Sequence, residues 1–332
     1  MRHLFTALLV ASAIVGPAAA QDKSWVGKTI ILKKSGVKIG QSDAKGNQVF
    51  VATLTMTDYR VLGEQDGWIK VKDGRANEGW FDKVDAVVLE DAVAFFTDRI
   101  RQNPNSSDAY NRRAIAHQLQ GKLDEAIDDF GQSLRLNPSA VIHCNRGNAW
   151  RVKKEYDKAI ADYDDSLRID PKHFFGYLNR GIAWSSKKEY DKAIADFGEA
   201  VRLDPKYVLT YFSRGNAWAA KKEYEKAIAD YNEAIRLDPK HVGAYNRRAW
   251  IQATCFDARF RDGKKAIETA KKGLELAPKD ADLMDTLAAA YAEIGDFAEA
   301  VRMEERAIAI TNNAGYRSRL ELYKKMQPFR LK

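Results

Sequence analysis

The sequence predicts a chain in two parts, a small all-β barrel followed by an all-α solenoid of stacked helical hairpins. A 27-residue phrase recurs three times at a step of 34 residues, at 145–171, 179–205 and 213–239. A period of this length is typical of helical hairpins that bury their apolar faces against their neighbours. Residues 24–90 differ, because short apolar segments alternate there with glycines, a pattern typical of short strands and tight turns.

The first twenty residues predict a secretory signal peptide. A basic start precedes an apolar run from Leu4 to Val15, and small residues follow it up to Ala20. This order is typical of a segment cleaved after Ala20, although a retained N-terminal anchor is the alternative. We therefore expect an exported protein, in the periplasm or secreted. No later apolar run is long enough to predict a membrane span.

The net charge and the two cysteines limit which partners and which disulfides we expect. The formal net charge of +8 is modest for 332 residues and allows weak binding to polyanions without requiring it. Cys144 and Cys255 fall three hairpins apart, too far for a disulfide if each packed helix layer adds about 10 Å. Both are predicted to be free thiols.

Strands are expected at 28–32 and 48–52, and a second pattern follows them at 59–62, 67–71 and 78–81. This second pattern resembles the bacterial Src-homology-3-like fold over residues 24–90. The resemblance implies a barrel that either binds cell-wall peptide or acts as a spacer. Trp68 and Trp80 are interpreted as core or rim aromatics rather than as ligand-stacking residues.

Residues 89–104 read as one amphipathic helix, with Ala92, Phe96 and Ile100 on one stripe. We interpret residues 91–106 as a half-repeat that caps the solenoid and couples it rigidly to the barrel. Prolines at regular intervals then predict where helices end, because proline cannot continue a helix: Pro104, Pro138, Pro171, Pro205, Pro239 and Pro278.

Residues 107–312 read as six hairpins that resemble the tetratricopeptide repeat, with an insertion at 254–263 in the fifth. The resemblance depends on recurring small residues in each first helix (Ala114, Gly147, Gly181, Gly215, Ala249 and Ala288) and in each second helix (Ala126, Ala159, Ala193, Ala227, Ala266 and Ala300). The recurring Trp150, Trp184 and Trp218 are predicted to be packing residues. Residues 315–332 are expected to form a final capping helix and a tail.

An arginine replaces the leucine that this family usually places before the glycine slot. Sixteen residues later an aspartate follows, which predicts structural pairs within four hairpins: Arg113 with Asp129, Arg146 with Asp162, Arg180 with Asp196 and Arg214 with Asp230. In the sixth hairpin both positions change together, to Leu287 and Met303. In the fifth, Arg248 faces Thr269, with Glu268 as a possible substitute partner.

The family resemblance implies that the first helix of each hairpin lines a concave groove. Its polar members would be Asn111, Arg112, Asn145, Asn148, Arg151, Asn179, Asn216, Asn246 and Arg247, and its apolar members Phe175, Leu178, Ile182, Leu209, Phe212 and Trp250. Spaced asparagines can pair with the backbone of an extended peptide. The alternative is that they only solvate this face. Cys144 and Leu209 occupy two lysine positions of the family's carboxylate clamp, which argues against a C-terminal chaperone peptide.

Lysine pairs recur at three turns, at 153–154, 187–188 and 221–222, where a polyanion could bind, but an adjacent glutamate makes a solvated edge the favoured interpretation. No enzyme motif, metal-ligand spacing or cofactor motif is present in the sequence, and nucleic acid is not expected as a partner. The sequence predicts a non-enzymatic scaffold that binds an extended segment of a partner protein. The alternatives are an adaptor that binds peptidoglycan through the barrel and a regulatory subunit of an envelope enzyme.

Overall fold

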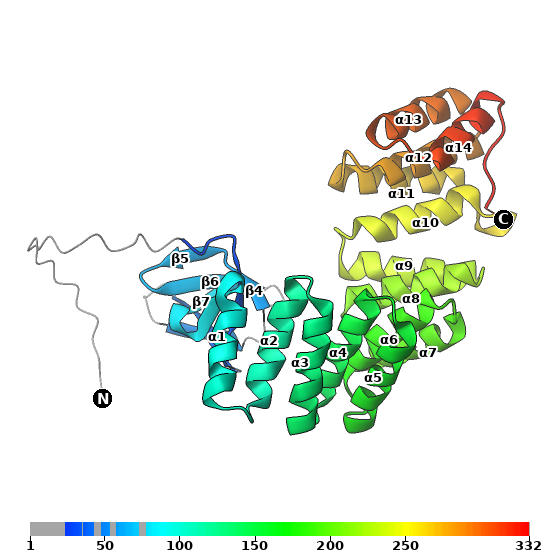
Figure 1. Ribbon diagram of the computed structural model, residues 1–332. Coiled ribbons are helices and arrows are strands. Elements are labelled where there is room, and N and C mark those ends of the chain that lie inside the picture. Colours follow the sequence, from blue (N-terminus) through cyan, green and yellow to red (C-terminus); the bar gives the residue numbers. More distant parts are fainter. Residues whose placement is uncertain (1–23, 35, 43–47, 54–57, 73–77, 332) are drawn as a thin grey trace, which may run out of the picture. The chain divides into compact units, whose positions relative to one another are not determined.

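The computed structural model describes residues 24–34, 36–42, 48–53, 58–72 and 78–331, and the chain divides into two units after Pro104 (Figure 1). The predicted signal peptide, residues 1–20, lies outside the described residues. Among the described residues, no helix combines the length and the apolar character needed to cross a bilayer.

The first unit is rich in β-strand. Its described strands are β1 (Thr29–Leu32), β2 (Lys38–Ser42), β3 (Gln48–Thr53), β4 (Asp58–Arg60), β5 (Gly63–Gln65), β6 (Trp68–Lys72), β7 (Glu78–Asp82) and β8 (Ala86–Val88). They form two antiparallel sheets, in the order β4-β1-β8 and β3-β2-β7-β6-β5. Side chains from both sheets share one core, which includes Ile30, Ile69 and Phe81. The strands predicted at 28–32 and 48–52 are thus confirmed as β1 and β3.

Two local features connect the elements of the first unit, a tight turn between β5 and β6 and a helix that follows β8. Asp66 and Gly67 both have positive φ, at 47° and 81°, and together they make the two-residue turn between β5 and β6. This turn type suits the twist of paired strands. Helix α1 (Leu89–Gln102) follows β8 and buries Ala92, Phe96 and Ile100, as predicted. It contacts β1 and β8 within the first unit, and its role as a cap of the solenoid stays a prediction.

The second unit consists of helical hairpins. Its described helices are α2 (Ser107–Leu119), α3 (Leu123–Leu136), α4 (Ala140–Val152), α5 (Tyr156–Ile169), α6 (Phe174–Ser186), α7 (Tyr190–Leu203), α8 (Val208–Ala220), α9 (Tyr224–Leu237), α10 (Val242–Thr254), α11 (Gly263–Leu276), α12 (Ala281–Glu293), α13 (Phe297–Ile310) and α14 (Ala314–Lys324). Helices α2 to α13 pair in order as hairpins, and the second helix of each of the first five hairpins ends two residues before a predicted proline stop. The hairpin pattern of the sequence is confirmed.

Within the hairpins, small residues let the two helices approach. A methyl group built on Gly181 would lie 2.7 Å from the ring of Phe197, and one on Gly147 would lie 2.7 Å from the ring of Tyr163. These aromatic rings are buried, and Trp150 and Trp184 pack against the same clusters. The recurring tryptophans are therefore packing residues, as predicted. Both cysteines are buried and unpaired, which confirms the free thiols.

The four predicted arginine–aspartate pairs are all present. Each guanidinium donates two hydrogen bonds to one carboxylate, at 2.6 to 2.9 Å, in Arg113–Asp129, Arg146–Asp162, Arg180–Asp196 and Arg214–Asp230. The aspartates are 3 to 6% exposed, so the pairs link the two helices of each hairpin in a largely dry environment. The pairs are structural. In the sixth hairpin Leu287 and Met303 are both buried in one apolar cluster instead.

The fifth hairpin breaks the pattern. Arg248 donates to the hydroxyl of Thr269 at 3.2 Å and to Asn232 at 2.7 Å, while its buried Nε atom has no hydrogen-bond partner. Burial lowers the pKa of Arg248, whereas the hydrogen bonds to Asp230 raise the pKa of Arg214. Glu268, the possible substitute, pairs with Lys272 instead, so that suggestion was wrong.

Replacing Thr269 by aspartate is therefore expected to stabilise the protein. The new carboxylate would face Arg248 as Asp230 faces Arg214, and a hydrogen bond to a charged group contributes about 1.5–3 kcal/mol. Thermal unfolding of Thr269→Asp and of the matched Thr269→Asn measures the effect. The account requires the charged variant to melt higher than the neutral one, and equal melting temperatures would contradict it.

The paired lysines have two structural roles. The first lysine of each pair reaches back to the preceding hairpin, in the ion pairs Lys153–Asp124, Lys187–Asp157 and Lys221–Asp191. The second lysine occupies the left-handed turn, with φ of 63°, 63° and 62° at Lys154, Lys188 and Lys222. Glycine occupies the equivalent turn in the first and sixth hairpins, at Gly121 and Gly295. The lysine edge thus contributes to the packing and turning of the hairpins.

Glycine in place of Lys188 is expected to raise the free energy of unfolding by about 0.5–1 kcal/mol. The left-handed conformation costs an L-residue about 1–2 kcal/mol, and the greater chain entropy of glycine offsets part of the gain. Lys187→Gly is the matched control, since Lys187 has a negative φ of −81° and pairs with Asp157. Chemical denaturation should show opposite signs for the two variants, and a loss in both would contradict the account.

Candidate functional site

The first helices of the hairpins contact one another in two runs, from α2 to α8 and from α10 to α12. Helix α4 contacts α2 and α6, α6 contacts α8, and α10 contacts α12. We call the surface made by α2, α4, α6, α8, α10 and α12 the A face. The family resemblance places the predicted groove on this surface.

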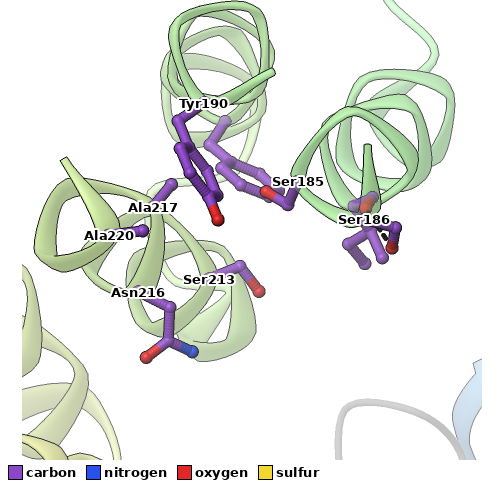
Figure 2. A pocket seen from close by; sticks show the side chains of 9 residues that line it. Ser185, Ser186, Tyr190, Ser213, Asn216, Ala217 and Ala220 are labelled. Atoms are coloured by element: carbon purple, nitrogen blue, oxygen red, sulfur yellow. Dashed lines mark hydrogen bonds between the residues drawn. The ribbon is translucent and has the colours of Figure 1, made fainter. Parts of the chain in front are cut away.

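A hollow of about 360 Å³ lies on the A face between the third and fourth hairpins. Figure 2 shows Ser185 and Ser186 of α6 on one side, Ser213 and Asn216 of α8 on the other, and Tyr190 of α7 between them. The full lining is Ile182, Ser185, Ser186, Tyr190, Phe197, Ser213, Asn216, Ala217 and Ala220. The hollow therefore has an apolar floor and a rim of hydroxyl and amide groups.

One hydroxyl of this rim lacks a partner. The Oγ atom of Ser185 is buried and has no hydrogen-bond partner, while the hydroxyl of Ser186 donates to the carbonyl of Ile182 at 3.0 Å. A buried hydroxyl without a partner is costly, and because this atom has almost no exposed surface, a ligand could bond it only after the side chain turned into the hollow. The volume and the lining of the hollow suit a small side chain.

The sequence pointed to only two of these lining residues, Ile182 and Asn216. Apart from the aromatic Tyr190 and Phe197, the others are small serines and alanines, which carry little chemical signal individually. A comparison between hairpins would have found them, because the positions of Ser185 and Ser186 hold Arg151 and Val152 in the second hairpin. The third hairpin thus has small side chains where the second has large ones, and this difference leaves space for the hollow.

The predicted asparagines are partly used within the protein. Asn148 and Asn216 accept hydrogen bonds from the hydroxyls of Tyr163 and Tyr231, at 2.8 and 2.9 Å, and burial raises the pKa of both tyrosines so that these hydroxyls stay protonated. The remaining contacts link hairpins: Asn145 to Asn111, Asn179 to Cys144, and Asn246 to Thr286. The tyrosine bonds occupy the amide oxygens of Asn148 and Asn216, so the amide NH2 is the group each can offer a ligand.

Two predicted groove residues are not available on the A face. Leu178 is 2% exposed and belongs to the core between the third and fourth hairpins. Arg112 is 3% exposed, and its Nε donates to Asp108 at 2.7 Å. Both predictions were wrong. They assigned each side chain to a face from its position within the repeat, and that position does not show how deeply neighbouring side chains cover it.

The other predicted groove residues vary in exposure. Phe175 and Leu209 are 48% and 40% exposed, and Arg247 is exposed as well. Phe212 packs on His241, with ring centroids 4.7 Å apart. Arg151 is half-buried, and its Nε has no hydrogen-bond partner.

One group of side chains has metal-ligand proximity. The ligand atoms of His143, Asp162 and Asp165 lie within 4.8 Å of one another. Both oxygens of Asp162, however, accept hydrogen bonds from Arg146. The guanidinium of Arg146 beside this carboxylate disfavours a metal ion, so the group is better explained as an extension of the structural pair. Burial also raises the pKa of the nearby Cys144 to about 11, which keeps its thiol protonated.

The stacked hairpins and the A face define the class of this molecule, a helical repeat protein. Family models described as "Tetratricopeptide repeat" match residues 107–139, 140–173, 175–207, 208–241 and 281–314. The chain therefore contains tetratricopeptide repeats, and these segments belong to that family.

Known relatives and structures agree with this class. A stretch of 61 residues, 18% of this chain, is 36% identical to "Tetratricopeptide repeat protein 36" of Caenorhabditis elegans and covers 34% of that protein. The chain thus spans about a third of the length of this curated relative. Two solved structures share the fold alone, at low identity. The C-terminal part of a repeat protein from Cytophaga hutchinsonii is 22% identical, with a TM-score of 0.55 over 69% of this chain and 93% of that one. YrrB, described as a repeat protein "with an unusual peptide-binding site", is 20% identical, with a TM-score of 0.50 over 59% and 97%.

Proposed function

We propose that the protein is an exported, non-enzymatic scaffold that holds an extended segment of a partner protein against its A face. As a class, tetratricopeptide repeats mediate interactions between proteins. YrrB, which shares the fold, is described as having a peptide-binding site. The observation that carries the proposal is the hollow between α6 and α8, where an apolar floor meets hydroxyl and amide groups. An extended peptide can bury one side chain in such a hollow and bond its backbone to the rim.

Filling the hollow tests this proposal. Tryptophan at Ala220 would occupy the space between α6 and α8, while tryptophan at Ala195, an exposed position of α7 outside the hollow, is the matched control. Partners would be captured from envelope extract by residues 21–332 and by both variants after their melting temperatures are compared. We expect the Ala220→Trp chain to lose partners that the Ala195→Trp chain keeps. An identical catch from both variants would contradict the proposal.

Export is part of this proposal and has its own measurement. The basic and apolar order of residues 1–20 supports cleavage after Ala20. Mass spectrometry of the protein purified from its native cells is expected to find Gln21 as the first residue. A protein that keeps residues 1–20 would instead be anchored or retained inside the cell.

We further propose that the first unit is a Src-homology-3-like domain, which makes a cell-wall adaptor the second candidate function. The antiparallel pairing of β6 with β7 and the position of Trp68 support it. Trp68 is 48% exposed, so the interpretation of this residue as a core aromatic does not hold, and a rim position that could stack on a ligand remains. Co-sedimentation of residues 21–332 with purified sacculi, compared with Trp68→Ala, tests this function. Equal sedimentation of the two chains would remove Trp68 as a ligand contact.

A further inference from the structure

The end of the chain turns back onto the A face. Helix α14 ends at Lys324, and a turn follows in which Met326 has a φ of 57°. Residues 327–331, which we call the tail, then run in extended form past α12 to the end of α10 (Figure 1). The backbone N–H of Leu331 donates to the carbonyl of Thr254 at 2.8 Å, and Leu331 forms a parallel bridge with Cys255.

Three consecutive tail side chains each have a defined partner. The ring of Phe329 lies 5.7 Å from the ring of Trp250, which was predicted to line the groove. The guanidinium of Arg330 lies 2.5 Å from Glu293. Leu331 packs into the cluster that contains Cys255 and Phe260. We call Trp250, Thr254, Cys255, Phe260 and Glu293 the tail site, which thus offers an aromatic surface, a carboxylate, an apolar contact and a backbone acceptor.

The insertion in the fifth hairpin helps to build this site. The loop between α10 and α11 supplies Cys255 and Phe260, and Arg261 from the same loop donates to the carbonyls of Cys255 and Phe256 at 2.8 and 2.9 Å. Arg261 also pairs with Glu293 at 2.9 Å, which holds that carboxylate beside Arg330. The loop that lengthens only this hairpin therefore shapes the surface on which the tail lies.

The tail site is held from a second side by α14. The guanidinium carbon of Arg319 lies 5.3 Å from the ring of Trp250 and 5.4 Å from the ring of Phe329, while its Nε donates to Asp285 at 2.5 Å. The cation therefore contacts both rings of the aromatic pair and is fixed by a carboxylate, so the site is ordered by residues outside the tail.

We propose that the tail site binds extended protein segments that carry an aromatic, a basic and an aliphatic residue in succession, and that the chain's own tail occupies it until such a partner displaces it. This inference rests on the proposed function, because it names the partner chemistry for one end of the A face. Specificity comes from Trp250, Glu293 and the apolar cluster of Cys255 and Phe260, which contact the three side chains in turn, while the Thr254 carbonyl bonds the backbone of any sequence. The tail competes strongly with a separate partner segment for this site, because its short connection to α14 gives it an effective concentration of about millimolar.

A synthetic peptide with the sequence of residues 324–332 is the probe for this site. It carries a fluorescent label, and its binding is followed by polarisation with two chains, residues 21–332 and residues 21–326. The chain without the tail is expected to bind the peptide at least about tenfold more tightly than the full chain, since its site is empty. Peptides with Phe329→Ala or Arg330→Glu should bind at least about tenfold more weakly, and a peptide with Gln327→Ala should bind unchanged.

A second variant covers the case in which removal of the tail unfolds the chain. The full chain with Phe329→Ala and Arg330→Glu keeps its length but weakens its own tail, so it is expected to bind the unchanged peptide more tightly than the wild type. Trp250→Ala in this background should abolish that gain. Equal binding by wild type and by folded tail variants, or no binding by any of them, would overturn the proposal. A wild-type chain that sediments as a tail-dependent dimer would overturn the intramolecular assignment.

The outcome separates this inference from the proposed function. If the peptide binds at the tail site but the Ala220→Trp chain loses no partner, the tail-site proposal stands and the hollow is excluded as a binding surface. If that chain loses partners but the peptide does not bind, the hollow stands as the binding surface and the tail-site proposal is wrong.

Discussion

Replacing Asp230 by alanine is expected to lower the free energy of unfolding by about 3 kcal/mol. Arg214 makes two hydrogen bonds to this carboxylate, at 2.7 and 2.8 Å, and its side chain is only 23% exposed. Without Asp230 the partly buried charge of Arg214 would lose its carboxylate, and this uncompensated desolvation is the source of the cost. For a unit of this size the melting temperature should fall by roughly 6–12 °C.

The chain itself supplies the rescue control. The sixth hairpin places Leu287 and Met303 where the earlier hairpins place the pair, so Arg214→Leu combined with Asp230→Met should recover most of the lost stability. Asp196→Ala should cost less than Asp230→Ala, because Arg180 keeps a second carboxylate, Asp164, at 2.5 Å. Equal melting of the Asp230→Ala variant and the wild type would dispose of the stabilising role of the pairs.

Replacing Glu304 by glutamine is expected to stabilise the protein strongly at alkaline pH and weakly at acid pH. Glu304 is 0% exposed on α13, it lies beside the carboxylate of Asp285, and Arg319 lies 3.7 Å away. Burial, then the neighbouring carboxylate of Asp285, raises the pKa of Glu304 well above its usual value. The folded protein therefore holds this side chain neutral at neutral pH.

The direction of the pH effect follows from proton binding. Above the unfolded pKa of about 4.3, the unfolded chain loses the proton that the folded chain keeps, so the stability of the wild type falls as the pH rises toward the folded pKa, by up to about 1.4 kcal/mol per pH unit. Glutamine has no proton to release and removes this slope. Denaturant unfolding at pH 5.5 and pH 8.5 measures it, with the accessible Glu305→Gln as control. A gap between wild type and Glu304→Gln that did not widen at pH 8.5 would contradict the assignment.

The repeat architecture could be predicted from the sequence because each hairpin repeats the same constraints. Small residues at Gly147 and Gly181, aromatic rings opposite them, and arginine–aspartate pairs at a constant spacing all report contacts within one hairpin. Periodicity reveals such contacts directly. The first unit was less predictable, since glycines and short apolar runs indicate strands but do not determine the order β3-β2-β7-β6-β5.

The candidate site was predicted only in outline. Positions within the repeat indicated the A face and placed Trp250 on it. They did not indicate the serine-lined hollow, and they assigned the buried Leu178 to the groove. The tail was expected only to follow a capping helix, because nothing periodic in residues 325–331 indicates that they return to α10. Contacts between segments about 80 residues apart, such as Leu331 with Thr254, depend on the tertiary fold and leave no local pattern.

The central claim, that the A face holds an extended partner segment, is tested most directly by photo-crosslinking in cells. A photoreactive amino acid placed at Ser213, in the hollow, is compared with one at Ala195, outside it. The account predicts adducts with a partner protein from position 213 alone, and mass spectrometry should map them to a continuous stretch of that partner. Adducts of equal yield from position 195, or none from position 213, would contradict it.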